Sequence, residues 1–178
     1  MFSEKLKEFI KSEEFVLVYT ELDDDDKFEF GKIIACDGAF FALKSFAPKG
    51  APDGFTVKRI DDIYEIQLKT IYTHKMSVLI KENGQAEETY VLDNRDLIQS
   101  ALSYALEHEC IVDVYIEDSE YCRRGFVESV KGDCLTMKQV DTYGNDDGIS
   151  IIKVSDLEYI SCDSVDTRSL MQLYKDKH

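Results

Sequence analysis

The side chains best suited to bind a ligand in this sequence are lysines and an arginine that alternate with aromatic residues. They fall into two groups, which are Lys44, Phe46, Lys58 and Arg59 in the first half of the chain and Lys138, Tyr143 and Lys153 in the second. Cationic side chains attract phosphate groups, and aromatic rings stack on unpaired bases. One interpretation is therefore a face that contacts RNA. The other, which we favour, places the rings in the core and the lysines on the solvent side of strands.

The charge of the whole chain argues against a general affinity for nucleic acid. Its 178 residues include 36 acidic and 21 basic side chains, which gives a net charge of −15. Affinity for a phosphate backbone depends on Lys and Arg side chains that release counterions. We therefore expect general nucleic-acid binding to be weak or absent, and any RNA contact to be local.

Sequence patterns that carry catalysis or hold a cofactor are absent. The sequence contains no GxSxG, HExxH or Walker-type stretch. Its five cysteines include no CxxC pair, which favours reduced thiols over a zinc site. The acidic run at residues 23–26 lacks the ligand spacing of a calcium loop and is typical of a solvated loop. We expect a protein that is not an enzyme and that uses no metal or cofactor.

Two stretches of the chain repeat each other at a spacing of 94 residues. Residues 146–160 read DDGISIIKVSDLEYI, and residues 52–66 read PDGFTVKRIDDIYEI. Residues 31–66 align with residues 125–160 without a gap, and eight of the 36 aligned positions are identical. Because glycines and apolar positions match together, the sequence predicts an internal duplication.

A helical pattern precedes each copy. The apolar residues that share one helix face are Phe2, Leu6, Phe9 and Ile10 in the first copy and Leu97, Ala101, Leu102, Ala105 and Leu106 in the second. Asp93 or Asn94 is expected to cap the second helix. We therefore expect a first helix-plus-barrel domain over residues 1–82, a linker over residues 83–93 and a second such domain over residues 94–178.

A further helix is expected after each copy, with Thr73 and Thr167 as matched N-caps. The first of these helices would end at Asn83-Gly84, a usual C-terminal stop. The alternative is that Asn83-Gly84 turns a β-hairpin between residues 77–81 and 88–92.

Each copy shows short apolar stretches between turn residues, which predict five strands. The expected strands are Phe15–Glu21, Phe28–Ala35, Phe40–Ser45, Thr56–Ile60 and Ile63–Gln67, then Cys110–Glu117, Tyr121–Val130, Cys134–Gln139, Ile149–Lys153 and Leu157–Ser161. The repeated Asp-Gly dipeptides are expected to form tight turns. Five short, curved strands close most easily into a small barrel, which leaves few exposed edges. The expected fold is mainly β with flanking helices (α+β), as two tandem five-stranded barrels, each preceded by a helix.

A helix followed by a strongly bent five-stranded barrel resembles the Sm/LSm family, which includes Hfq-like proteins, and the barrel is also SH3-like. GKIIACDGAFFAL looks like the first motif of the Sm/LSm family, with Gly31 and Asp37 at its glycine and aspartate. KRIDDIYEI looks like the second motif, with Arg59 at its arginine. For a member of this family the resemblance implies RNA binding.

The sequence departs from the family at the residues that contact RNA. The asparagine of the family falls on Phe41 and Leu135, and its aspartate is replaced by Lys131 in the second copy. The glycine that follows the arginine is replaced by Ile60 and Val154. These departures weaken the case for an RNA site more than the case for a barrel.

The leading hypothesis is a cytoplasmic, non-catalytic protein-interaction module built from a duplicated small barrel. The alternative is an Sm-like RNA-binding regulatory protein. Two related barrels offer strand edges and helix faces to a protein partner or to a second copy. No apolar run approaches the roughly eighteen residues of a membrane helix, and the start of the sequence alternates charged and apolar residues, unlike a signal peptide. We therefore expect a soluble protein without a membrane partner.

Overall fold

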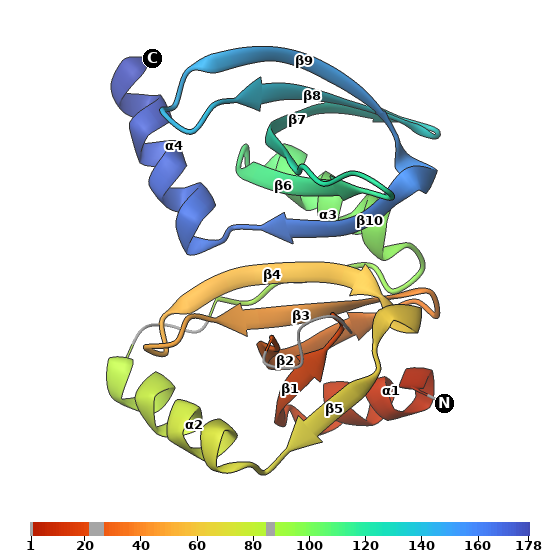
Figure 1. Cartoon of the computed structure of the whole chain (residues 1–178), viewed down its shortest axis with the longest axis vertical. Helices are drawn as coiled ribbons and strands as arrows, with labels where there is room; N and C mark the ends of the chain where they lie inside the picture. Colours follow the sequence, from red (N-terminus) through yellow and green to blue (C-terminus); the bar gives the residue numbers. More distant parts are fainter. Residues whose placement is uncertain (1, 22–26, 85–87) are drawn as a thin grey trace. The chain divides into compact units, whose positions relative to one another are not determined.

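A computed structural model describes residues 2–21, 27–84 and 88–178. The chain divides into two compact units, Met1–Leu97 and Ile98–His178, which follow each other along the colour bar of Figure 1. The acidic run at residues 23–26 lies outside the described residues. Each unit carries one copy of the repeat.

The described part of the first unit contains two helices and five strands. In chain order these are α1 (Phe2–Ser12), β1 (Phe15–Tyr19), β2 (Glu29–Cys36), β3 (Phe40–Phe46), β4 (Pro52–Arg59), the 3-10 turn η1 (Ile60–Asp62), β5 (Glu65–Leu68) and α2 (Ile71–Asn83). The second copy has the same order, with α3 (Leu97–Glu107), β6 (Ile111–Ile116), β7 (Arg123–Lys131), β8 (Cys134–Val140), β9 (Asp146–Lys153), the 3-10 turn η2 (Val154–Asp156), β10 (Leu157–Cys162) and α4 (Val165–Lys177). This recurrence supports the predicted duplication.

The strands of each unit form an open antiparallel sheet, so the prediction of closed five-stranded barrels is wrong. The strand order is β5-β1-β2-β3-β4 in the first unit and β10-β6-β7-β8-β9 in the second. Among the described residues no ladder joins β5 to β4 or β10 to β9, as a closed barrel requires. The 3-10 turns η1 and η2 redirect the chain, so that the last strand pairs with the first strand of its copy instead of with its predecessor. The Sm-like or SH3-like barrel is thereby corrected to a mainly β fold with open sheets and helices.

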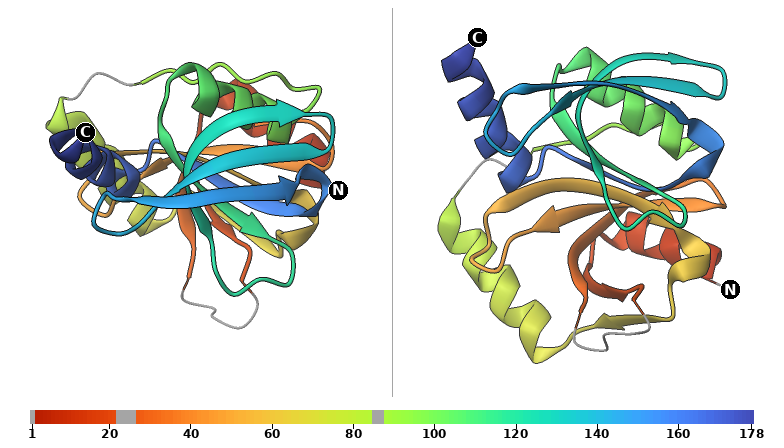
Figure 2. Two further views of the ribbon diagram at one scale, coloured as in Figure 1. Left: turned by 90° about the horizontal axis from the view of Figure 1, so that it is seen from above. Right: turned by 45° about the horizontal axis from the view of Figure 1, so that its top comes forward.

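Helices cover both faces of the first sheet. Val16 and Val18 of β1 pack in one core with Leu6 of α1, whereas Leu17 packs in another core with Met76 of α2. This division follows from the alternation of side chains along a strand. The curved strands and the helices beside them can be followed in Figure 2.

The second unit repeats this arrangement. Leu170 of α4 packs with Ile111 and Val140 on one sheet face. On the other side, the Cys162 thiol of β10 lies 4.0 Å from the carbonyl oxygen of Ala101 in α3. Both C-terminal helices, α2 and α4, thus cover equivalent faces.

The repeated dipeptides Asp53-Gly54 and Asp147-Gly148 lie inside strands and not in the predicted tight turns, whereas Asp37-Gly38 and Gly132-Asp133 do lie in turns between strands. Gly54 and Gly148 have φ angles of 68° and 84°, and the register of both ladders shifts at this point. A glycine with positive φ inside a ladder allows a β-bulge. As a consequence β4 and β9 begin at Pro52 and Asp146, several residues earlier than predicted.

The predicted helix over residues 74–84 is confirmed, because α2 runs to Asn83 and Gly84 ends it in the left-handed conformation. The predicted caps Thr73 and Thr167 are wrong by one turn. Their backbone N–H groups donate to the side chains of the true N-caps, Thr70 and Ser164, at 3.1 Å in each case. In each helix the N-cap and the residue three positions after it are both Ser or Thr. The residue type alone therefore did not distinguish the true cap from the predicted one.

The start of α3 also differs from the prediction. The Asp93 carboxylate accepts a hydrogen bond from the backbone N–H of Arg95, two residues ahead of the helix. The backbone N–H of Leu97 instead donates to Oδ2 of Asp37 at 2.8 Å. A carboxylate far away in the sequence therefore fulfils the role expected of a local cap.

Candidate binding site

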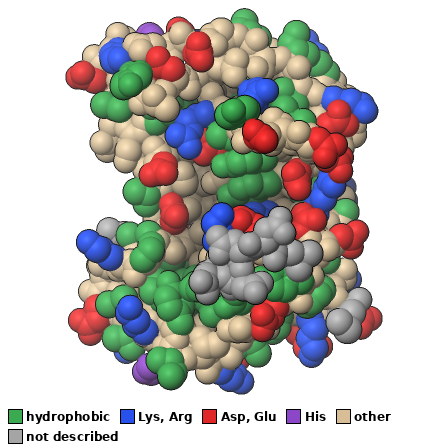
Figure 3. Space-filling view, in the orientation of Figure 1, with side chains coloured by type: hydrophobic (Ala, Val, Ile, Leu, Met, Phe, Trp, Pro, Cys, Tyr) green, Lys and Arg blue, Asp and Glu red, His purple; other side chains and the backbone are tan. Residues whose placement is uncertain are grey.

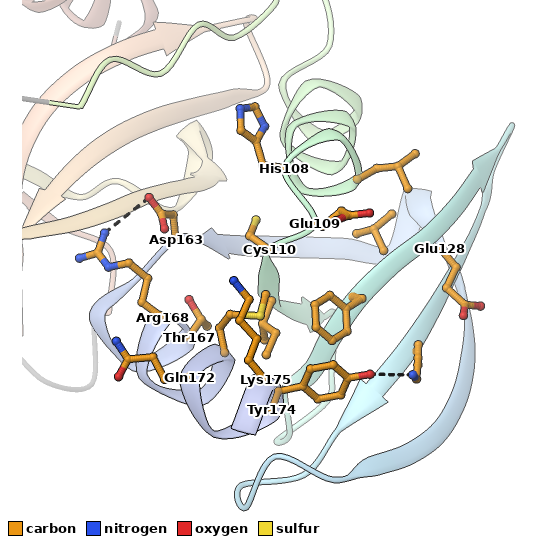
Figure 4. A pocket seen from close by; sticks show the side chains of 16 residues that line it. His108, Glu109, Cys110, Glu128, Asp163, Thr167, Arg168, Gln172, Tyr174 and Lys175 are labelled. Atoms are coloured by element: carbon orange, nitrogen blue, oxygen red, sulfur yellow. Dashed lines mark hydrogen bonds and ion pairs between the residues drawn. The ribbon is translucent and has the colours of Figure 1, made fainter. Parts of the chain in front are cut away.

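A pocket of about 710 Å³ lies between α4 and the sheet of the second unit (Figure 4). Its lining comes from the end of α3, from β6, β7 and β8, and from α4. Pockets of roughly 300–1,000 Å³ are typical of sites for small ligands. We therefore take this pocket and the sheet beside it as the candidate binding site.

One row of directly paired residues runs across the sheet on the pocket side. Ile111 pairs with Phe126, Phe126 with Lys138, and Lys138 with Ile149. Directly paired residues project from the same face of a sheet. The first three side chains line the pocket, and Ile149 of β9 extends the same row to the edge of the sheet.

The α4 helix forms the opposite wall. Thr167, Met171 and Tyr174 all line the pocket and recur at a spacing of three to four residues, so they share one helix face. The Tyr174 ring lies 4.9 Å from the Phe126 ring in an edge-on arrangement. The cap at Ser164 fixes where this helix begins and hence where the three side chains point.

Lys138 is held by two partners at the side of the pocket. Its Nζ lies 2.8 Å from the hydroxyl of Tyr174 and 2.9 Å from Oδ1 of Asp146. The hydrogen bonds to Tyr174 and Asp146 raise the pKa of Lys138 above its ordinary value, so the side chain is charged at neutral pH. An ammonium group carries three donors, of which these partners use two.

The thiols near the pocket are unsuited to nucleophilic chemistry. Burial raises the pKa of the Cys110 thiol to about 11, and burial likewise raises the pKa of Cys162. Because the thiolate is the reactive form, these thiols are mostly unreactive at neutral pH. The guanidinium of Arg168 is paired as well, because its Nη1 lies 3.5 Å from Asp163 (Figure 4). The arrangement suits binding.

The first unit has a pocket of about 550 Å³ in the equivalent place, between β1 and α2. Phe15 and Thr73 occur there where Ile111 and Thr167 line the larger pocket. The two pockets differ at other aligned positions, where Lys69, His74 and Ser77 of the first correspond to Asp163, Arg168 and Met171 of the second. The two copies thus share a pocket at the equivalent place, but the side chains that line it differ.

The residues of the first unit that were predicted to contact RNA are engaged within the protein. Lys44 is buried, and its Nζ donates to a backbone carbonyl at 2.7 Å. Phe46 is buried in the core beneath α2. Nζ of Lys58 lies 2.5 Å from the Glu29 carboxylate, and Arg59 is partly buried at the end of β4. A role of these residues in RNA binding stays a prediction. Their contacts within the protein do not favour it.

The predicted residues of the second unit are spread along the β8–β9 hairpin. Lys138 lies in the middle of β8, and Tyr143, which is 72% exposed, lies in the turn. Lys153 lies at the far end of the hairpin, where its Nζ is 3.3 Å from Asp156. The structure therefore places only Lys138 at the pocket.

Sequence reasoning missed the buried pair formed by Asp113 and Arg124. Two hydrogen bonds of 2.5 and 2.6 Å join the guanidinium to the carboxylate, and this raises the pKa of Arg124. Burial, together with the neighbouring Cys122 and Asp113, raises the pKa of Tyr115 to about 12. The sequence did offer a signal for this pair, because the charged Arg124 aligns with the aromatic Phe30 of the first copy.

Ile149, which extends the row beside the pocket, and its neighbour Ile151 were also missed as candidates, because both were assigned to a strand of the predicted barrel. Among the described residues no group of three or more His, Cys, Asp or Glu side chains is placed to hold a metal ion. Within the same residues, no helix has both the length and the apolar character that crossing a bilayer requires.

Comparison with known proteins gives no family assignment. The chain matches no protein-family model, no curated protein and no solved structure at a significant level.

Proposed function

We propose that the protein is a non-catalytic protein-interaction module that accepts an extended segment of a partner at β9, along the edge of this strand and over its exposed face. The observation that carries this proposal is the exposure of two isoleucines on that strand, 64% for Ile149 and 75% for Ile151. Both residues lie on one face of β9, because they are two positions apart.

The position of β9 makes it suited to pair with another strand. In the described part of the chain it pairs with β8 and is the last strand in the sheet order. An edge strand presents unpaired backbone N–H and C=O groups on one side, which an added strand can satisfy. Natural edges are commonly protected by central charges or proline, but the charges of β9 lie at its ends, at Asp146, Asp147 and Lys153.

The corresponding strand of the first unit shows how unusual this exposure is. Phe55 of β4 aligns with Ile149 and is buried. Its ring lies 4.8 Å from the ring of Tyr90. Exposed apolar side chains that are covered in a duplicated copy are typical of a surface that meets a partner.

A protein partner fits the charges of the described residues better than RNA does, since the candidate lysines are bonded to carboxylates, a carbonyl or a hydroxyl of the protein. A cytoplasmic location and a relationship to the Sm/LSm family are further parts of this proposal, and both rest on the sequence.

The test is a selection of peptide segments from a display library against the wild-type chain, combined with light scattering of the protein alone. We expect either enriched extended segments or a self-associated species at micromolar concentration. Burial of one Ile side chain contributes about 2 kcal/mol, so Ile149→Lys or Ile151→Lys should weaken either interaction at least about tenfold.

Ile71→Lys is the matched control, because Ile71 is an isoleucine of α2 that is 92% exposed. This variant should bind as the wild type does. A strictly monomeric chain that enriches no segment, or segments that bind both β9 variants unchanged, would contradict the proposal.

A further inference from the structure

In the first unit, the chain itself covers a part of the sheet face whose counterpart around Ile149 is exposed in the second. Residues 88–90 have no regular secondary structure and lie on β3 and β4. The carbonyl oxygen of Glu88 accepts a hydrogen bond from Nζ of Lys44 at 2.7 Å. Two residues later, the Tyr90 ring packs on Phe55 at 4.8 Å, and only 9% of Tyr90 is exposed. We call residues 88–90 the covering segment.

The covered row in the first unit has the same register as the row beside the pocket of the second. Phe15 pairs with Lys32, Lys32 with Lys44, and Lys44 with Phe55. The duplication aligns these residues with the row that runs from Ile111 to Ile149. The lysine that binds the covering segment and the residue beneath its aromatic ring therefore both have counterparts, Lys138 and Ile149.

The counterpart row is open to a ligand at its β9 end. Ile149 is 64% exposed, whereas Phe55 is buried. Lys138 stays charged and uses two of its three donors within the protein. Next to it, the pocket of about 710 Å³ offers space that Phe126 and Tyr174 line with aromatic surface.

We infer that the partner segment carries an aromatic side chain two residues after a carbonyl group that accepts a hydrogen bond from Lys138. The aromatic ring packs on Ile149, as Tyr90 packs on Phe55 in the first unit. This inference rests on the proposed function and names the chemistry of the partner. In the covering segment this spacing of two residues lets the carbonyl group and the ring both contact the sheet.

The covering segment also indicates which residue should dominate the affinity. Tyr90 combines a large apolar ring with a hydroxyl that donates to the Glu88 carboxylate at 2.6 Å, so the pair is pre-organised within the segment. Aromatic residues of this kind contribute a large share of the binding energy at protein interfaces. Loss of the ring should therefore weaken binding more than loss of any other side chain of the segment.

The experiment uses a fluorescein-labelled peptide with the sequence of residues 88–93, Glu-Thr-Tyr-Val-Leu-Asp, titrated with the full-length protein and followed by fluorescence anisotropy. We expect saturable binding. Alanine in place of the tyrosine should weaken it at least about tenfold, and so should Ile149→Lys in the protein. Ile71→Lys should leave it unchanged.

Methyl NMR locates the site independently of affinity. With isoleucine methyl groups labelled, the signals of Ile149 and Ile151 should shift on addition of the peptide, and that of Ile71 should not. Shifts confined to the first unit would mean that the peptide only displaces the covering segment, and they would overturn the inference.

Failure of this inference can be told apart from failure of the proposed function. Selected segments that need Ile149 but lack an aromatic residue would overturn the inference and leave the proposed function in place. A peptide that shows no binding at about 1 mM, or that binds Ile149→Lys as tightly as the wild type, overturns the inference in either case.

Discussion

At the scale of single residues, the two copies differ in the cross-strand pair beneath their C-terminal helices. In the first unit Leu17 pairs with Phe30, and Phe30 belongs to a cluster of aromatic rings. In the second unit the same positions hold Asp113 and Arg124. The Asp113 side chain is 7% exposed and the Arg124 side chain 28%, so the charges are largely withdrawn from water and depend on each other.

We expect Asp113→Leu to lower the free energy of unfolding by about 3 kcal/mol, because it leaves a half-buried guanidinium without its carboxylate. Urea denaturation of the full-length protein measures this change. The double variant Asp113→Leu, Arg124→Phe recreates the pair of the first unit and should return the stability to within about 1 kcal/mol of the wild type. A double variant less stable than Asp113→Leu would contradict this account.

The cysteines provide a second prediction at the scale of residues. Burial raises the pKa of Cys110 to about 11, so that only about one thousandth of it is thiolate at pH 8. Iodoacetamide should therefore modify the exposed Cys134 first and Cys110 much later, with the Cys110 rate rising as the pH approaches 11. Peptide mass spectrometry after timed labelling at several pH values measures both rates. Equal rates at pH 8 would show that the Cys110 thiol is not shielded as described.

At the scale of elements, each copy presses the turn between its third and fourth strands onto its C-terminal helix. A Cβ atom on Gly144 would come within 2.9 Å of backbone atoms of Leu173 and Tyr174 in α4. The aligned Gly50 has the same relation to α2, with backbone atoms of α2 at 2.9 Å. Both glycines also have positive φ angles, 83° and 80° in chain order. The contact that positions α4 over the pocket thus requires glycine for two reasons.

We expect Gly144→Ala to destabilise the protein by about 3 kcal/mol, through backbone strain and the clash with α4. The matched control is Gly132→Ala. Gly132 also has a positive φ, 58°, but no atom lies within 4 Å of a Cβ built there, so only the strain of about 1 kcal/mol applies. Chemical denaturation of both variants provides the comparison. Equal losses would show that the approach of the turn to α4 is not needed.

At the scale of the whole molecule, the net charge of −15 governs what the surface attracts. On the face shown in Figure 3, Lys and Arg side chains lie among Asp and Glu side chains and form no continuous basic surface. Each of the four lysines named as possible RNA contacts has a hydrogen-bond or ion-pair partner within 3.3 Å. They are Lys44, Lys58, Lys138 and Lys153. Long-range repulsion and local neutralisation therefore act in the same direction.

We expect mixed RNA to bind more weakly than micromolar affinity at physiological salt, with little gain at low salt, because few phosphate contacts can release counterions. Titration of labelled RNA at two salt concentrations measures both quantities. Submicromolar binding with a steep salt dependence would favour the RNA-binding alternative over a protein-interaction module.

The sequence by itself determined the duplication, most of the strands and the helices that flank them. Matched glycines and alternating apolar residues are local signals. They recur in register when residues 31–66 are aligned with residues 125–160, so the sequence alone reveals them. The Asn83-Gly84 stop of α2 was recognised for the same reason. Errors began where a local signal had two meanings, as at the Asp-Gly bulges and at the helix caps.

Only the tertiary structure decided whether the sheets close and which faces stay uncovered. The sequence of an apolar strand does not indicate whether its side chains are covered. The aligned residues Phe55 of β4 and Ile149 of β9 are both apolar, but Phe55 is buried and Ile149 is exposed. The difference involves residues far away in the sequence, such as Tyr90, whose ring packs on Phe55. Periodicity reports which side of a strand is apolar, but contacts between distant segments determine what covers that side, and the candidate site depends on those contacts.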